Sequence, residues 1–139
     1  MPNWTRLWCA PLVVLVITAG CGKDPGSIES QVAASIPDEP FISGLRITPL
    51  DPERANTPVR YSAQIFVFDF QSDVVGGTCE IDTSVGKFSR RIDALPRGVA
   101  VCEFTILVST PQQIPGSIAV IDRGGHRSNS LTFVLGITA

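Results

Sequence analysis

The chain has 139 residues, which is enough for one domain and too few for two well-packed ones. Apolar residues make up 44% of the chain and charged residues 17%, which excludes a disordered polyelectrolyte. A formal net charge of −2 excludes the basic composition of a nucleic-acid-binding protein, and one His, four Cys and one Met provide few ligands for a metalloenzyme. Twelve glycines and eleven prolines favour a loop-rich all-β domain over a helical bundle.

The first 20 residues have the organisation of an export signal. Arg6 supplies a positive charge, and an unbroken apolar run follows from Leu12 to Ile17. Even with its apolar flanks this run is interrupted by Pro11 and is shorter than the ~20 residues of a membrane-spanning helix. We therefore expect residues 1–20 to be a signal peptide that is removed on export.

The signal ends in Thr18-Ala19-Gly20-Cys21, small residues followed by a cysteine. This sequence resembles the lipobox of bacterial lipoproteins, in which the cysteine becomes the first residue of the mature chain. The resemblance implies that the Cys21 thiol carries a diacylglyceryl group and that its amine is open to acylation with a chain such as palmitate. Two or more acyl chains anchor a protein stably to a membrane. The alternative is an ordinary secretory signal in which Cys21 has no such role.

Gly22 follows Cys21, where an Asp would favour retention in the inner membrane of a two-membrane bacterium. The resemblance therefore implies a place in the bacterial cell envelope, at the outer membrane. Residues 21–40 have the composition of an acidic tether, with one lysine and four acids: Lys23, Asp24, Glu29, Asp38 and Glu39. From Gly22 to Pro40 a coil spans ~25 Å, and an extended chain reaches ~65 Å. We expect this segment to join the anchor to a folded domain, residues 41–139.

From Phe41 onward apolar residues recur with a period of two, as in strands that bury one face. The strands expected from this pattern are 44–50, 59–70, 78–82, 86–92, 99–108, 117–122 and 130–137. The segment from Pro111 to Pro115 is expected to be a loop. Seven short strands in about 99 residues predict an all-β two-sheet sandwich. Its apolar stripes should share one core that contains Ile65, Val67, Phe104, Ile106, Leu131 and Phe133.

The segment from Pro115 to Asn129 contains a Gly-led strand, Asp122, a Gly-Gly-His turn and a final Ser-Asn pair. It is similar to the last hairpin of bacterial immunoglobulin-like domains, although His126 stands where Asn is commoner. The resemblance implies an immunoglobulin-like sandwich for residues 41–139. It implies no particular activity, because such sandwiches serve many unrelated functions.

Cys79 and Cys102 are the only thiols in the expected domain. An exported chain meets oxidising conditions, which favours a disulfide between them, across adjacent strands. Their spacing is much shorter than that of the antibody-type inter-sheet bond, so we expect a different bond from that one. A loop of this size contributes roughly 3 kcal/mol to stability. The alternative is two buried free thiols, and without a nearby His the pair lacks the ligand set of a metal site.

Candidates for catalysis or metal binding are few. His126, the only histidine, lies in a Gly-Gly-His-Arg turn, where we expect a solvated turn residue rather than a catalytic base. No nucleophile elbow, phosphate-binding loop or zinc spacing is present in the sequence. Four acids could offer oxygens to Ca²⁺ but lack the EF-hand spacing, so we expect solvated strand ends: Asp69, Asp73, Glu80 and Asp82. We therefore predict no cofactor, no metal and no enzymatic activity.

Two surface features remain. The first is a small basic patch, expected to be a solvated sheet edge that discourages edge pairing: Arg90, Arg91 and Arg97. The second is a strand end that is apolar on both faces because three aromatic residues alternate with core positions: Phe66, Phe68 and Phe70. We expect a bulge or a covering segment, with Phe41 and Ile42 folded back, to bury these rings. The alternative is an exposed patch that binds a partner.

Two classes of function fit these observations. The favoured one is a non-enzymatic envelope lipoprotein, a small sandwich on a tether that binds or supports another envelope component. The second is a sandwich module that binds a small ligand or a glycan through its loops. An exposed patch of Phe66, Phe68 and Phe70 would favour the protein partner, and a concave loop cluster with convergent polar groups would favour the ligand.

Overall fold

A computed structural model describes residues 37–139, so the predictions for the signal peptide, for Cys21 and for residues 21–36 lie outside the described residues. The described part contains seven strands and no α-helix. The strands are β1 (Phe41–Pro49), β2 (Val59–Phe68), β3 (Thr78–Thr83), β4 (Gly86–Arg91), β5 (Val99–Ile106), β6 (Gln112–Ile121) and β7 (Leu131–Ile137). One short 3₁₀ turn, η2 (Pro96–Gly98), precedes β5.

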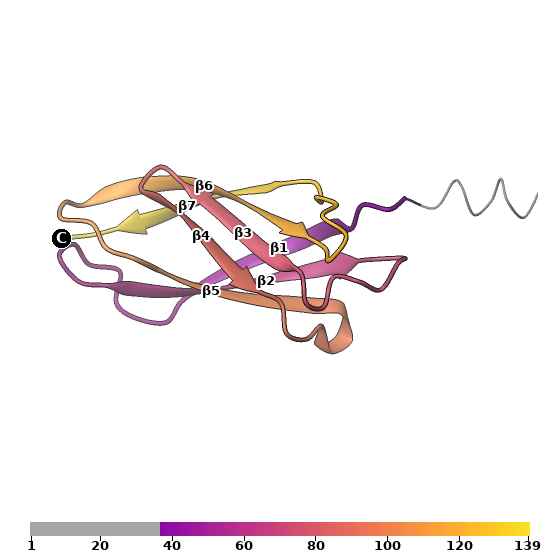
Figure 1. Cartoon of the computed structure of the whole chain (residues 1–139). Helices are drawn as coiled ribbons and strands as arrows, with labels where there is room; N and C mark the ends of the chain where they lie inside the picture. Colours follow the sequence, from indigo (N-terminus) through magenta and orange to yellow (C-terminus); the bar gives the residue numbers. More distant parts are fainter. Residues whose placement is uncertain (1–36) are drawn as a thin grey trace, which may run out of the picture. The chain divides into compact units, whose positions relative to one another are not determined.

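The strands form two sheets packed face to face (Figure 1). One sheet has the order β1-β2-β5 and the other the order β4-β3-β6-β7, and every pairing is antiparallel. Seven strands in two antiparallel sheets over about 100 residues are the immunoglobulin-like architecture. The predicted fold class is therefore confirmed. The start of β1 and the β6–β7 connection lie at one end of the sandwich, and the C-terminus lies at the other (Figure 1).

The core lies between the sheets and is built by alternate residues of each strand. The inward residues of β2 are at most 8% exposed: Val59, Tyr61, Ala63, Ile65 and Val67. The ring of Phe104 on β5 is 5.4 Å from that of Tyr61, 5.6 Å from that of Phe88 and 6.3 Å from that of Phe133. The core also contains Ile106, and Leu131 and Phe133 pack against it half-buried, which confirms the expected shared core.

Strand β6 begins earlier than the sequence indicates, because the expected loop of residues 111–115 is strand from Gln112 onward. Pro115 pairs with Val134 of β7, and its carbonyl accepts a hydrogen bond from Ser84 N (3.1 Å), just past the end of β3. The N–H and C=O of a strand residue point to the same side, so an N–H at position 115 would point past the end of β3. It would have no ladder partner there, and proline therefore loses no hydrogen bond at this position. Proline is tolerated in a strand at such a position.

Candidate functional site

Four phenylalanines form an exposed cluster on the three-stranded sheet, where β2 ends and β1 begins. We call the aromatic patch the set of Phe41, Phe66, Phe68 and Phe70, which are 54%, 50%, 54% and 72% exposed. The expectation that Phe41 and Ile42 would bury Phe66, Phe68 and Phe70 is wrong. Phe41 lies opposite Phe68 with the ring centroids 6.2 Å apart, so it extends the exposed cluster. Ile42 points the other way and is completely buried in the core.

The expected irregularity is present in β1, but it supports the patch rather than covering it. One extra residue lies between Ser43 and Arg46 relative to β2. Within this bulge Gly44 has a φ of +62°, and a Cβ at this position would lie 2.6 Å from the ring of Phe66. Only glycine meets both conditions without strain. The bulge therefore leaves room for the Phe66 ring beside the backbone of β1, next to a groove of about 230 Å³.

The aromatic patch differs from ordinary surface apolarity. Single exposed apolar side chains are normal on a soluble protein, whereas apolar residues gathered on neighbouring strands mark an interaction surface. Phe41 lies opposite Phe68 in the β1–β2 ladder, Phe66 lies two residues before Phe68 on the same face of β2, and Phe70 lies two residues beyond Phe68. Phenylalanine is enriched in protein–protein interfaces. The patch therefore has the chemistry of a surface that binds an apolar partner.

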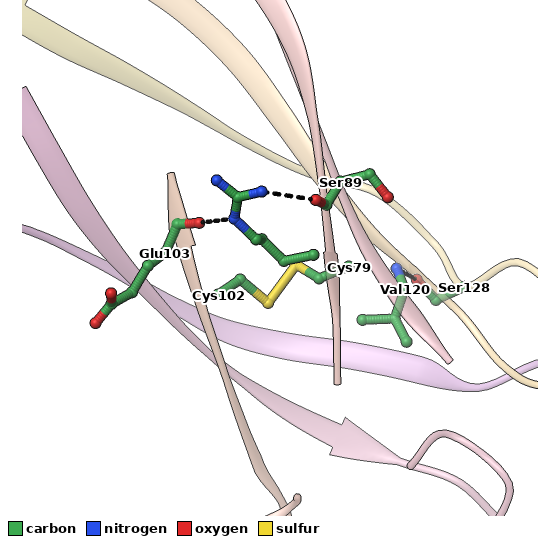
Figure 2. The surroundings of a disulfide bond; sticks show 7 residues. Cys79, Ser89, Cys102, Glu103, Val120 and Ser128 are labelled. Atoms are coloured by element: carbon green, nitrogen blue, oxygen red, sulfur yellow. Dashed lines mark hydrogen bonds between the residues drawn. A yellow bond between two sulfur atoms is a disulfide. The ribbon is translucent and has the colours of Figure 1, made fainter. Parts of the chain in front are cut away.

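The predicted disulfide between Cys79 and Cys102 is present (Figure 2). Its Cα atoms are 6.4 Å apart, and both residues are at most 1% exposed. Cys79 lies on β3 and Cys102 on β5, so the expectation of adjacent strands is wrong and the bond joins the two sheets. The 23-residue separation is short because the chain crosses from one sheet to the other between β4 and β5.

Arg90 forms a second link across the same gap. It lies opposite Cys79 in the β3–β4 ladder, and its guanidinium donates from Nε to the carbonyl of Glu103, next to Cys102 (2.9 Å). A second bond reaches the carbonyl of Ser89 (3.3 Å), and dashed lines in Figure 2 mark both. Arg90 therefore occupies a backbone acceptor of β5 on the solvent side of the disulfide. The other two arginines of the expected basic patch lie elsewhere, Arg91 against Asp93 (3.4 Å) and Arg97 in η2.

The four acids that could offer oxygens to calcium do not form one cluster. Asp69 accepts hydrogen bonds from the backbone N–H groups of Gln71, Asp73 and Val74 at 3.0, 2.7 and 3.0 Å, so its carboxylate holds the β2–β3 turn. Glu80 and Asp82 lie on β3 and pair with basic residues instead. Within residues 37–139 no group of three or more His, Cys, Asp or Glu side chains could hold a metal ion.

A groove of about 310 Å³ lies on the outer face of the four-stranded sheet. Its polar lining residues are Glu80, Asp82, Lys87, Ser89 and Arg127. The charges in it already neutralise one another, because Lys87 pairs with Asp82 (3.2 Å) and Arg127 with Glu80. The groove is thus a sheet surface with satisfied ion pairs rather than the loop cluster that would favour a ligand.

His126 holds a turn through Asp122, a partner that the sequence analysis missed. Asp122 is 4% exposed and accepts from the backbone N–H of His126 (2.8 Å), while its other oxygen lies 3.0 Å from Nδ1 of the imidazole. Burial tends to raise the pKa of Asp122, but the hydrogen bonds from His126 prevail and hold that pKa below its ordinary value. The bond to Asp122 in turn raises the pKa of His126. The Asp-x-x-x-His spacing across the turn could have indicated this pair.

No helix among residues 37–139 is long and apolar enough to cross a membrane. No family model and no curated protein matches the chain.

Solved structures align with most of the chain, among them these three. The solution structure of the CARDB domain of the PF1109 protein from Pyrococcus furiosus has 11% identity and a TM-score of 0.47, and the alignment covers 73% of this chain and 98% of that one. The PKD domain of an M14-like peptidase from Thermoplasmatales archaeon SCGC AB-540-F20 has 15% identity and a TM-score of 0.46, covering 74% and 100%. A crystal structure of the CARDB domain in complex with di-metal ions has 12% identity and a TM-score of 0.44, covering 73% and 90%. The strand order and pairing of this chain themselves show its immunoglobulin-like fold.

Proposed function

We propose that this protein is a non-enzymatic lipoprotein of the bacterial cell envelope, attached to the outer membrane through Cys21, whose immunoglobulin-like domain binds another envelope protein. The observation that carries this proposal is the exposed aromatic patch. Exposure of Phe66, Phe68 and Phe70 is the feature that separates a protein-binding module from a ligand-binding one. The surface groove with its paired charges offers no comparable support for a small ligand.

The titratable groups also favour a non-enzymatic role. In an enzyme, residues with perturbed pKa values lie together in a cleft beside a nucleophile or a substrate. Burial raises the pKa of Tyr61 well above its ordinary value, and its hydroxyl donates to Glu53 Oε1 (2.9 Å), which ties the β1–β2 connection to the core. The Asp122–His126 pair holds the β6–β7 turn. The shifts of Tyr61, Asp122 and His126 therefore belong to structural contacts.

The anchor is supported by the sequence, since Cys21 follows an export signal and small residues. Metabolic labelling with a palmitate analogue tests it in the full chain. Cys21→Ala should abolish the label and release the protein from the membrane fraction. Cys9→Ala, which changes only the part of the signal that would be removed, should leave the label unchanged. Undiminished labelling of Cys21→Ala would contradict the proposed anchor.

Site-specific photo-crosslinking in intact cells tests the binding surface. A benzophenone amino acid at Phe68 should give a discrete protein adduct, and the same group at Leu107, which is 62% exposed near the opposite end of the sheet, should not. Phe70→Ser should reduce the adduct formed from position 68. Identical adducts from positions 68 and 107, or adducts with lipid alone, would contradict a protein partner at the patch.

A further inference from the structure

The two sheets have four edge strands, namely β1, β5, β4 and β7. An edge strand exposes unpaired backbone groups that can pair with another chain, and proteins block such edges with charges, prolines, bulges or covering groups. β1 carries three such devices, because it contains the bulge before Arg46, the arginine itself and Pro49. β4 is six residues long and contains three basic residues, Lys87, Arg90 and Arg91.

The edge formed by β5 is blocked as well. It contains Glu103, and the guanidinium of Arg90 occupies the Glu103 carbonyl. β7 differs from these three strands. Its sequence, Leu-Thr-Phe-Val-Leu-Gly-Ile, contains no charged residue and no proline, and its register with β6 runs without a shift from residue 131 to residue 137. β7 is therefore the one edge among the described strands whose own residues supply no blocking device.

The direction of the free backbone groups of β7 follows from its register with β6. Val134 lies opposite Pro115, whose carbonyl points to the β3 side, where it accepts from Ser84 N. Pro115 and Val134 are therefore a non-hydrogen-bonded pair of the antiparallel ladder, in which the backbone groups of the two residues point away from each other. The N–H and C=O of Val134 thus face the open edge. Because direction alternates along a strand, Thr132 and Gly136 face the same way.

The backbone groups of Thr138, just after β7, face the same open edge and form hydrogen bonds there. Its N–H donates to the carbonyl of Glu53 (2.9 Å), and its carbonyl accepts from the N–H of Ala55 (2.9 Å). The β1–β2 connection thus blocks the edge only at its C-terminal end. Within residues 37–139, no such bond is made by the edge-facing backbone groups of residues 132, 134 and 136.

We propose that β7 pairs with β7 of a second copy of this chain, antiparallel and about a two-fold axis at Val134, so that the two four-stranded sheets join into one of eight strands. In this register Val134 lies opposite Val134 of the other copy and Thr132 opposite Gly136. All seven residues of β7 are then paired, and each edge-facing N–H meets a carbonyl. A two-fold contact of this kind is self-complementary and closes after two copies.

Charge and shape favour a second copy as the occupant. Like charges placed opposite each other destabilise strand pairs, and a strand without charge avoids this conflict when it pairs with itself. Val134 is 61% exposed and would pack against its own copy across the axis. A Cβ at Gly136 would have no atom within 4 Å, so the place opposite Thr132 is open.

The arrangement is also compatible with the proposed lipid anchor. Antiparallel pairing puts the two starts of β1 at opposite ends of the pair. Residues 22–40 reach up to ~65 Å when extended, so both copies of Cys21 could enter one membrane with the pair lying along it. The proposal itself rests on the edge strand and stands apart from the anchor.

Cysteine crosslinking of the full chain in its membrane tests the register. Facing residues of such a pair have Cα atoms ~5.5 Å apart, within disulfide range, so Val134→Cys should form a disulfide-linked dimer under mild oxidation. Thr132→Cys is the matched control. It is exposed on the same face of the same strand, but its two copies would lie about 14 Å apart in this register and should stay unlinked. Equal linking at both positions, or none at Val134→Cys, would overturn the proposal.

The mass of the detergent-solubilised full chain tests the association independently. The wild-type chain should have the mass of a dimer by light scattering, and Val134→Lys should have the mass of a monomer because two ammonium groups would face each other. Val101→Lys, a substitution at a 49% exposed apolar position on the other sheet, should stay dimeric. A monomeric wild-type chain would overturn the proposal, whether the edge is then covered by residues 22–36 or by a strand of another protein.

Discussion

The side-chain amide of Asn129 bonds both backbone groups of Ile42. Its Oδ1 accepts from Ile42 N (2.8 Å), and its Nδ2 donates to the carbonyl of Ile42 (2.9 Å). The amide thus replaces a neighbouring strand at the start of β1, and it ties the two sheets together at the end of the sandwich near the aromatic patch. The preceding Ser128 accepts from Val120 N (2.8 Å) and fixes the chain that carries the amide.

Asn129→Ala should lower the free energy of unfolding by about 1–3 kcal/mol, because it leaves the N–H and C=O of a buried residue without partners. Urea denaturation followed by circular dichroism measures the change. Gln113→Ala, at an exposed position of β6, should change it by less than about 0.5 kcal/mol. Equal effects of the two substitutions would show that the Asn129–Ile42 bonds add nothing to stability.

Phe104→Ala should destabilise the domain by about 3–5 kcal/mol, since the ring is 1% exposed and contacts three other aromatic rings. Phe133→Ala should have a smaller effect, because that side chain is only half-buried at the margin of the core. Arg97→Ala in the exposed η2 turn is the control and should change stability little. Chemical denaturation measures all three, and a Phe133 effect above that of Phe104 would contradict this picture of the core.

Cys79 and Cys102 should resist alkylation in the native protein and in the denatured, unreduced protein, and should react only after reduction. Loss of the bond should cost about 2–4 kcal/mol of stability, because it closes a 23-residue separation and joins the two sheets. Mass spectrometry after alkylation counts the free thiols. Thiols found in the denatured, unreduced sample would show that the bond does not form.

Stability should fall as pH rises through the pKa of His126. Asp122 raises that pKa above 6.5, so the folded state binds the proton more tightly than the unfolded state does. The stabilisation is then complete below pH 6.5 and is lost as the pH passes the raised value. His126→Asn should remove this dependence, and an NMR titration of the imidazole should give a pKa above 6.5. A lower value in the folded protein would contradict the contact.

The alternation of apolar residues was sufficient to predict seven strands, because a period of two reports which face is buried, but it placed the starts of β1 and β6 too late. β2 illustrates both the strength and the limit of this signal. The pattern correctly placed Ile65 and Val67 in the core. It could not show whether Phe66, Phe68 and Phe70 on the other face are covered, since that depends on where β1 and its bulge lie relative to these rings.

Other features depend on contacts between distant parts of the chain, which periodicity does not report. Cys79 and Cys102 could be paired because they are the only thiols of the domain, but the sequence did not show that the bond joins the two sheets. The crossing of the chain between β4 and β5, which brings them together, changes nothing in the periodicity. Pro115 was misplaced in a loop because its tolerance in β6 depends on where β3 ends. Arg90 was predicted to lie at a sheet edge. The sequence did not show that its guanidinium donates to the carbonyl of Glu103, which belongs to the other sheet.

The contacts that close the sandwich also set an order for its assembly. Ile42 bonds to Asn129, 87 residues later, and Glu53 accepts from the Thr138 hydroxyl, 85 residues later. A chain exported amino terminus first would present β1 to the far side of the membrane long before either partner arrives. Closure of such long loops is slow, because their entropy must be lost before the contacts form. In a chain exported in this way, the contacts of Ile42 and Glu53 would form only after Asn129 and Thr138 have crossed, so closure of the sandwich would follow the translocation of these residues.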